Sequence, residues 1–194
     1  MQTDPNWGNF LYDRATGRLS LIDFGAARPF PRPFVDDYLR MVAACSQQDF
    51  PEVVRWSTRL GFLTGEESQA RSCYIPTPYC AAPTRFFLIL TPQVMLDAHC
   101  HAGAAVGTPF GHEGIYDFGQ HNQLTKRVSE LGATMLKHRL TAPPEDAYSL
   151  HRRLSGAFLV NIKLKARVAC REMFQRVFEG HRFADAAAMP PTTG

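Results

Sequence analysis

The residues of this sequence whose types and spacing could do chemistry lie near its start: Asp4, Asn9 and Asp23. Asn9 follows Asp4 by five positions, and Asp23, 14 residues further on, begins the triplet Asp-Phe-Gly. Phosphoryl transfer requires oxygen ligands for Mg²⁺ and a carboxylate that orients the attacking hydroxyl or water. The amide oxygen of Asn9 and the carboxylate of Asp23 suit the metal, and the carboxylate of Asp4 suits the nucleophile. The pattern therefore predicts a phosphotransfer site.

A β-hairpin is needed to bring Asp23 beside Asn9. Two short apolar runs, 9–12 and 19–24, flank a turn-forming cluster over 13–18, which predicts such a hairpin. The alternative gives Asp4 and Asn9 turn or helix-cap roles and makes Asp23 a strand-end cap. A second Asp-Phe-Gly triplet, 117–119, has no matching Asp and Asn upstream, so we expect a loop there.

Helices are expected to form most of the remaining chain. Apolar residues recur at helical spacing over 36–47, 50–60 and 122–140, and one or two further helices are expected after residue 145. Asp49 is the expected N-cap of the second of these helices. Three prolines between 29 and 33 are expected to break regular structure. The predicted fold class is mainly α with a short β-hairpin.

Composition excludes several classes of protein. The chain has 194 residues, and 45% of them are hydrophobic, too many for a disordered chain. The longest candidate apolar run, 86–90, has five residues, whereas a membrane-spanning helix needs about 20. The five cysteines include no Cys-x-x-Cys pair, so we expect a reducing compartment rather than a disulfide framework. The consecutive His99, Cys100 and His101 step about 100° around a helix, so they are not expected to converge on one ion.

Basic residues gather in the second half of the sequence. Residues 121–182 include 12 Lys or Arg and 5 Asp or Glu, whereas residues 1–120 include 9 Lys or Arg and 12 Asp or Glu. A basic helical half could face an anionic membrane surface or an acidic partner. The alternative is an ordinary solvated helix face, because Lys and Arg are good exposed helix formers.

One stretch, 70–94, does not fit the helical pattern. It has four prolines and no acidic residue, and it interrupts a helix-like segment that would resume at Met95. Its end can be encoded by pyrimidine-rich codons finishing in CAG, as a translated splice acceptor would be. We therefore expect four parts: 1–69 with the catalytic loop, metal-binding hairpin and first helices; 70–94, an aberrant insertion resembling a retained intron; 95–182, the helical remainder; and 183–194, a disordered tail. The alternative for 70–94 is a genuine lineage-specific loop.

Two stretches carry a resemblance to a known family. Residues 2–10 (QTDPNWGNF) and 21–28 (LIDFGAAR) closely resemble UbiB (aarF-domain-containing) atypical kinases, in which Gln-Thr replaces the usual His-Arg before the catalytic aspartate. Residues 62–65, 116–119, 138–140 and 143–152 are similar to the animal mitochondrial members that support coenzyme Q (ubiquinone) biosynthesis. Apart from the insertion, the resemblance covers residues 1 to about 180.

The resemblance implies the C-lobe of a protein-kinase-like fold, with the small lobe missing, and an ATP- and Mg²⁺-dependent kinase or ATPase. By position, Asp4 matches the catalytic aspartate, and Asn9 and Asp23 match the metal- and cofactor-binding residues. The implied location is the matrix face of the mitochondrial inner membrane, although the sequence carries no visible targeting segment. The implied partners are coenzyme Q biosynthesis proteins and the membrane lipid surface, with no nucleic acid.

The sequence also departs from the family pattern. The family's Lys-x-Gly-Gln motif and the lysine and glutamate of its small lobe have no counterpart in these residues. We therefore expect a truncated product that binds nucleotide weakly and is inactive alone. Two other readings stay open: a small-molecule kinase of the aminoglycoside or choline type, and a non-catalytic helical module for protein interaction or membrane surfaces.

Overall fold

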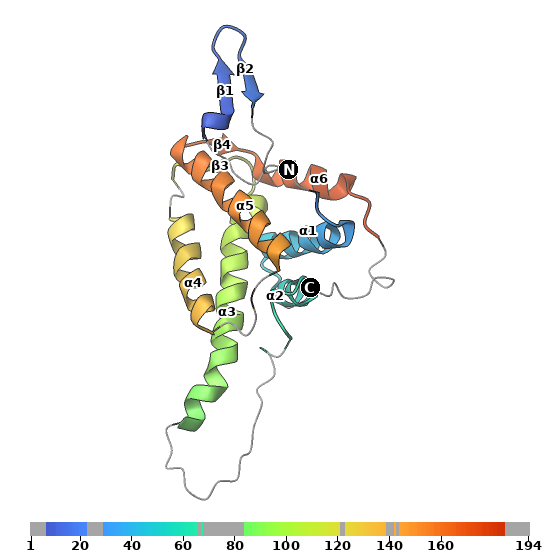
Figure 1. Cartoon of the computed structure of the whole chain (residues 1–194), viewed down its shortest axis with the longest axis vertical. Coiled ribbons are helices and arrows are strands. Elements are labelled where there is room, and N and C mark those ends of the chain that lie inside the picture. The colour runs from blue at the N-terminus through green and yellow to red at the C-terminus, as the bar shows by residue number, and fades with distance from the viewer. Residues whose placement is uncertain are drawn as a thin grey trace, which may run out of the picture.

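The computed structural model describes residues 7–22, 29–65, 67, 84–120, 123–138, 142 and 144–184. These residues form six α-helices and two small antiparallel sheets (Figure 1). The helices are α1 (Arg32–Gln47), α2 (Phe50–Arg59), α3 (Thr84–Gly111), α4 (Leu124–His138), α5 (Glu145–Lys163) and α6 (Cys170–Gly180). The mainly helical fold class is confirmed. Among the described helices, none is both long and apolar enough to span a membrane.

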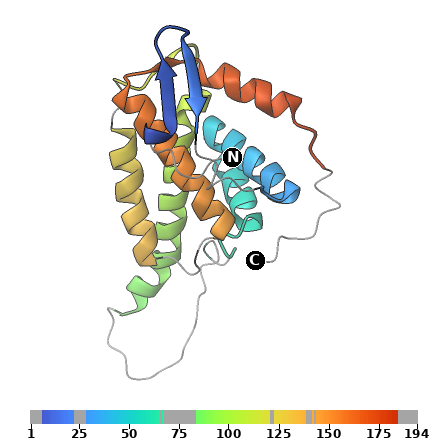
Figure 2. The ribbon, with the colours of Figure 1, turned by 45° about the horizontal axis from the view of Figure 1, so that its top comes forward.

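The expected hairpin is present at the N-terminal end. A 3₁₀ turn, Trp7–Asn9, leads into β1 (Phe10–Asp13), which pairs with β2 (Arg18–Leu21). The second strand ends three residues earlier than the apolar run 19–24 predicts. Figures 1 and 2 show this hairpin standing at one end of the helical body, away from the core.

A second small sheet was not expected from the sequence. Its strands, β3 (Tyr116–Asp117) and β4 (Arg167–Val168), are two residues each and far apart in the sequence. The prediction of a loop at the second Asp-Phe-Gly triplet is confirmed for Phe118 and Gly119, which lie in a turn, and is wrong for Asp117, which ends β3. Tyr116 and Phe118 are each 1% exposed, and their rings pack edge to face with centroids 4.8 Å apart. Burial of two aromatic rings holds this segment in place.

The N-terminal ends of the first two helices follow from capping chemistry. Pro33 lies in the first turn of α1, where its missing N–H costs no helical hydrogen bond, so the expected break there is wrong. The helix starts at Arg32, four residues before the predicted start. The predicted N-cap of α2 is confirmed, because the Asp49 carboxylate accepts a hydrogen bond from the Glu52 N–H at 3.3 Å.

The main core lies between α1, α2 and α3. Its buried side chains include Tyr38 and Cys45 of α1, Val53 of α2 and Cys100 of α3. Glycines let α1 and α3 cross in close contact. A Cβ placed on Gly107 would lie 2.4 Å from the Cys45 carbonyl carbon, so a larger residue would push the two backbones apart.

The end of the described chain returns to α1. The imidazole of His181 contacts the fully buried carboxylate of Asp36, which also accepts a hydrogen bond from the Ala184 N–H at 3.0 Å. The guanidinium of Arg32 donates to the Arg182 carbonyl at 2.7 Å. These contacts hold residues 181–184 against the helical body.

The boundaries expected around 70–94 and 183–194 stay predictions. Helix α3 begins at Thr84, so it includes the last part of the suspected insertion and runs without a break into the segment after Met95. Residues 70–83 and 185–194 lie outside the described residues.

Candidate functional site

Of the three predicted site residues, the structure describes Asn9. Asp4 and Asp23 lie outside the described residues. Asn9 ends the 3₁₀ turn and is partly buried, and its backbone carbonyl accepts a hydrogen bond from the N–H of Ile22 at 3.1 Å. This bond extends the strand register by one step beyond the pair Phe10 and Leu21. The hairpin therefore brings the residue directly before Asp23 opposite Asn9.

The turn of the hairpin fixes this register. The Asp13 carboxylate accepts hydrogen bonds from the Thr16 hydroxyl at 2.6 Å and the Ala15 N–H at 2.9 Å. These bonds, that from Thr16 foremost, lower the pKa of the Asp13 carboxyl below its ordinary value. Gly17 closes the turn with a φ of 66°, a left-handed conformation that glycine adopts at little cost. The turn that the sequence predicts over 13–18 is therefore the turn that joins β1 to β2 in the structure.

The donor set suits a hard divalent cation. An amide oxygen from Asn9 and a carboxylate from Asp23 are oxygen ligands, which Mg²⁺ prefers. The residues present thus fit Mg²⁺ by type. The backbone pairing of Asn9 with Ile22 joins Asn9 to the residue directly before Asp23. Within the described ranges, no three His, Cys, Asp or Glu side chains gather to hold a metal.

The second Asp-Phe-Gly triplet serves packing. The Asp117 carboxylate accepts hydrogen bonds from the backbone N–H groups of Gly119, at 2.9 Å, and Gln120, at 3.2 Å. Its other oxygen lies 3.9 Å from the Arg167 guanidinium. This carboxylate stabilises a turn beside the β3–β4 sheet. Asp117 and Asp23 each begin an Asp-Phe-Gly triplet, so Asp117 is a natural control position for Asp23.

The side chains of His99, Cys100 and His101 contact different surroundings. The His99 ring is 2.8 Å from the Ser57 hydroxyl, whereas the His101 ring is 2.7 Å from the Asp97 carbonyl on its own helix. Cys100 is buried, and burial foremost raises the pKa of its thiol to about 11. The geometry agrees with the expectation that a helix directs three consecutive side chains apart.

Sequence reasoning missed a cavity inside the helical body. It has a volume of about 460 Å³ and lies between α1, α3, α4 and α5. Two histidines line it, His99 from α3 and His151 from α5. No motif marks this cavity, because its described lining residues, apart from Phe62, come from helical positions that are also typical of an ordinary core.

Comparisons with known proteins agree with the hairpin motif. Residues 1–57 match the family described as the ABC1 atypical kinase-like domain. Over 94% of its length the chain is 40% identical to the mitochondrial atypical kinase COQ8B of Rattus norvegicus, of which it covers 30%. It is 36% identical to the mitochondrial atypical kinase coq-8 of Caenorhabditis elegans over 95% of the chain, and covers 22% of that protein. It is 35% identical to the mitochondrial atypical kinase COQ8 of Saccharomyces cerevisiae over 92% of the chain, and covers 31%.

The helical fold with its N-terminal hairpin and the matching motif define a protein related to kinases. More specifically, the chain belongs to the UbiB (ABC1) family of atypical kinases, and its similar relatives are named mitochondrial COQ8 kinases. The chain spans under a third of the length of these relatives.

Proposed function

We propose that this chain is the C-lobe part of an atypical kinase or ATPase that supports coenzyme Q biosynthesis in mitochondria. The observation that carries the proposal is the hydrogen bond from the Ile22 N–H to the Asn9 carbonyl, because Ile22 directly precedes Asp23 in the sequence. The same residues fall within the stretch that matches the ABC1 domain. The names of the similar proteins support the mitochondrial location and the coenzyme Q branch.

Each of the three residues has a separate role in the proposed reaction. Asn9 offers a neutral oxygen ligand and Asp23 an anionic one, so together they can hold a cation without adding excess negative charge. Asp4 accepts a hydrogen bond, and then the proton, from the attacking hydroxyl or water. Mg²⁺ bound with ATP would neutralise the charge on the phosphates at this position.

Residues outside this chain complete the site in the proposal. The family's phosphate-binding lysine has no counterpart among these 194 residues, so we propose that the chain alone binds Mg-ATP weakly. Titration of the purified chain with Mg-ATP tests this statement. Submicromolar affinity would refute it.

A chimera tests the proposed function in a complete protein. Residues 1–182 replace the matching part of the Saccharomyces cerevisiae COQ8 kinase, in a strain that lacks its own copy, and the ubiquinone content of the cells is measured. A second chimera omits residues 70–94 and tests whether that stretch is an insertion. We expect the shorter chimera to restore ubiquinone and the longer one to restore less.

Point variants of the shorter chimera connect the result to the motif. Asp4→Asn, Asn9→Ala and Asp23→Asn should each abolish the rescue, whereas Asp117→Asn in the second Asp-Phe-Gly triplet is the matched control and should keep it. Folding and expression are checked by immunoblot of the mitochondrial fraction. A stable chimera without rescue, or rescue that survives Asp23→Asn, would contradict the proposal.

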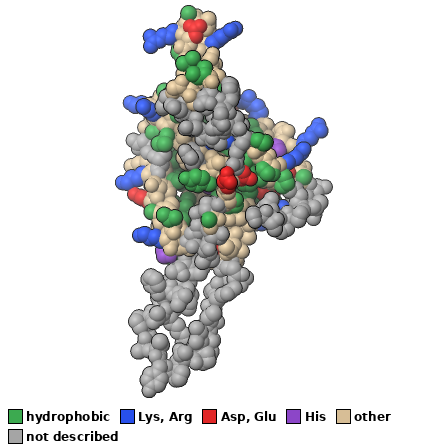
Figure 3. Space-filling view, in the orientation of Figure 1, with side chains coloured by type: hydrophobic (Ala, Val, Ile, Leu, Met, Phe, Trp, Pro, Cys, Tyr) green, Lys and Arg blue, Asp and Glu red, His purple; other side chains and the backbone are tan. Residues whose placement is uncertain are grey.

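A second candidate function is attachment to an anionic membrane surface. Lys163, Leu164 and Lys165 are consecutive and exposed at the end of α5, and Leu164 is 61% exposed. Such a basic and apolar cluster suits lipid headgroups. Figure 3 shows Lys and Arg side chains on several sides of the molecule, so charge alone does not select one face. Binding to anionic vesicles that is lost on replacing Lys163, Lys165 and Arg167 by Ala would support this function.

A further inference from the structure

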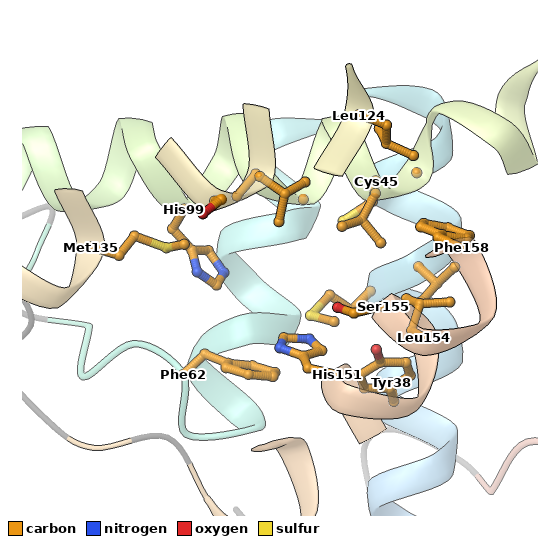
Figure 4. Close-up of a pocket in the computed structure, with 18 of the residues that line it drawn as sticks. Tyr38, Cys45, Phe62, His99, Leu124, Met135, His151, Leu154, Ser155 and Phe158 are labelled. Atoms are coloured by element: carbon orange, nitrogen blue, oxygen red, sulfur yellow. The ribbon is translucent and has the colours of Figure 1, made fainter. Parts of the chain in front are cut away.

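We propose that the cavity between α1, α3, α4 and α5 binds an unbranched apolar molecule with one uncharged hydrogen-bonding head, of the class of a long-chain alcohol. Figure 4 shows the cavity with its lining side chains. Asn9, the predicted site residue that the structure describes, is not among the described residues that line the cavity. The inference is therefore separate from the proposed phosphotransfer site.

The size of the cavity sets the size of the occupant. Its volume of about 460 Å³ falls in the range of roughly 300–1,000 Å³ that is typical of small-molecule sites. An apolar cavity of about 150 Å³ holds one benzene molecule. By proportion, this cavity has room for on the order of 18 non-hydrogen atoms. A void of this size among apolar side chains costs dispersion contacts, which an apolar occupant would restore.

The imidazole rings of the lining lie toward one part of the cavity, and the hydroxyl groups of Tyr38 and Ser155 lie on the side of Leu154 and Phe158. In Figure 4, His99 and His151 lie toward one part of the space, and Leu124 and Phe158 lie at the other end. The His151 ring stacks on Phe62 with centroids 5.1 Å apart and planes 15° apart. Stacking on Phe62 thus holds the His151 ring in place, and the His99 ring lies 2.8 Å from the Ser57 hydroxyl. In the proposal, the imidazole rings bond the polar head of the occupant, and side chains such as Leu124 and Phe158 contact its apolar tail.

The charge of the lining determines the charge of the head. Among the lining residues that the structure describes, none is Asp, Glu, Lys or Arg. A buried carboxylate or ammonium without an opposite charge is strongly disfavoured. A hydroxyl can both donate to and accept from an imidazole, depending on its tautomer. The lining therefore favours an alcohol over a fatty-acid anion.

Entry to the cavity lies between α4 and α5. Ser129 of α4 and Ser155 of α5 line the cavity and are themselves exposed. Tyr148 and Leu159 of α5 also line it while remaining 59% and 54% exposed. These side chains reach both solvent and the interior, so they mark the opening. Exposed apolar groups at an opening suit the passage of an apolar chain.

Titration of the 194-residue chain with decan-1-ol tests the proposal, with the heat of binding as the signal. We expect saturable binding of one molecule per chain and a rise in melting temperature when the alcohol is present. Sodium decanoate at pH 8 should bind at least tenfold more weakly. His151→Phe keeps a ring on Phe62 and removes both nitrogens, so it should weaken decan-1-ol about fivefold, as expected for one hydrogen bond.

Two variants on one helix provide the control. Ser155→Phe places a ring at the opening and should weaken binding at least tenfold. Ala157→Phe places the same ring at an exposed α5 position outside the lining and should leave binding unchanged. If circular dichroism shows that Ser155→Phe does not fold, Leu159→Trp, also at the opening, replaces it in the test. The proposal is overturned by an absence of saturable binding, by equal effects of Ser155→Phe and Ala157→Phe, or by tighter binding of decanoate.

Discussion

Replacing Gly107 by alanine tests the close crossing of α1 and α3, on which the shape of the helical body depends. The added Cβ would lie 2.4 Å from the carbonyl carbon and 2.5 Å from the carbonyl oxygen of Cys45, and 2.7 Å from the backbone nitrogen of Ser46. Ordinary contacts of a Cβ fall at 3.4–4 Å. The three atoms belong to the backbone, so no side-chain rotation relieves the clash, and α1 must move away from α3 by close to the missing distance.

The expected loss of stability follows from two opposing terms. Overpacking a well-packed core costs roughly 1–3 kcal/mol, and a clash with backbone belongs at the upper end. Alanine gains about 1 kcal/mol over glycine inside a helix. The net loss of unfolding free energy is therefore about 2 kcal/mol. In a chain of this length each kcal/mol changes the melting temperature by about 2–4 °C, so we expect a fall of about 4–8 °C.

Gly132→Ala is the matched control, because a Cβ at Gly132 in α4 would meet no atom within 4 Å. Helix propensity then acts alone, and the melting temperature should rise by about 2–4 °C. Thermal unfolding followed by circular dichroism at 222 nm measures both variants, and the test is the opposite sign of the two changes. An unchanged or higher melting temperature for Gly107→Ala would refute the close crossing.

Two further predictions concern buried ionisable groups. Burial acts to raise the pKa of Asp36, but hydrogen bonds from His181 and a backbone N–H, with nearby positive charge, hold that pKa below its ordinary value. The carboxylate therefore stabilises the fold above the ordinary pKa of about 3.9, and this contribution is lost as pH falls through the lower folded value. Asp36→Asn should lower the urea midpoint at pH 7, with a difference from the unmodified chain that shrinks below about pH 4; a constant difference would contradict this. Burial foremost raises the pKa of Cys45 to about 12 and that of Cys100 to about 11. Both thiols should resist iodoacetamide at pH 8 and react in urea, as peptide mass spectrometry would show, and rapid native labelling of either would count against their burial.

Local sequence signals predict local structure well in this chain. The turn around Asp13 and Gly17, and the cap at Asp49, depend on residues within a few positions of one another, so the hairpin and the start of α2 could be read from the sequence. The pairing of β3 with β4 joins Tyr116 to Val168 across the fold. Two-residue strands have no period to detect, so this sheet was not predictable.

The two candidate sites also differ in how far the sequence predicts them. The motif around Asn9 was recognisable because its residues lie close together in sequence and have chemistry that suits one reaction. The cavity takes its lining from four helices, and its histidines are 52 positions apart in sequence (His99 and His151). Hydrophobic periodicity identifies which helix faces turn inward, but it does not determine whether the facing side chains meet or leave a space.

Phe30, which precedes α1 in the chain, contacts both α1 and α5. The Phe30 ring stacks on Phe34 of α1 at 5.7 Å, and the Arg153 guanidinium of α5 lies 5.0 Å from the centre of the Phe30 ring. Both helices also line the cavity, although Phe30, Phe34 and Arg153 do not. Phe30→Ala therefore removes contacts with Phe34 and Arg153 and removes no atom of the described cavity lining.

Because Phe30 is partly buried, its truncation should lower the unfolding free energy by about 2 kcal/mol, below the roughly 3–5 kcal/mol of a fully buried phenylalanine. The affinity for decan-1-ol should stay within about twofold, because one methylene contact more or less is worth under a kcal/mol. Thermal unfolding and calorimetric titration of the same preparation measure both quantities. A loss of affinity that parallels the loss of stability would mean that the shape of the cavity depends on the contacts of Phe30 with α1 and α5.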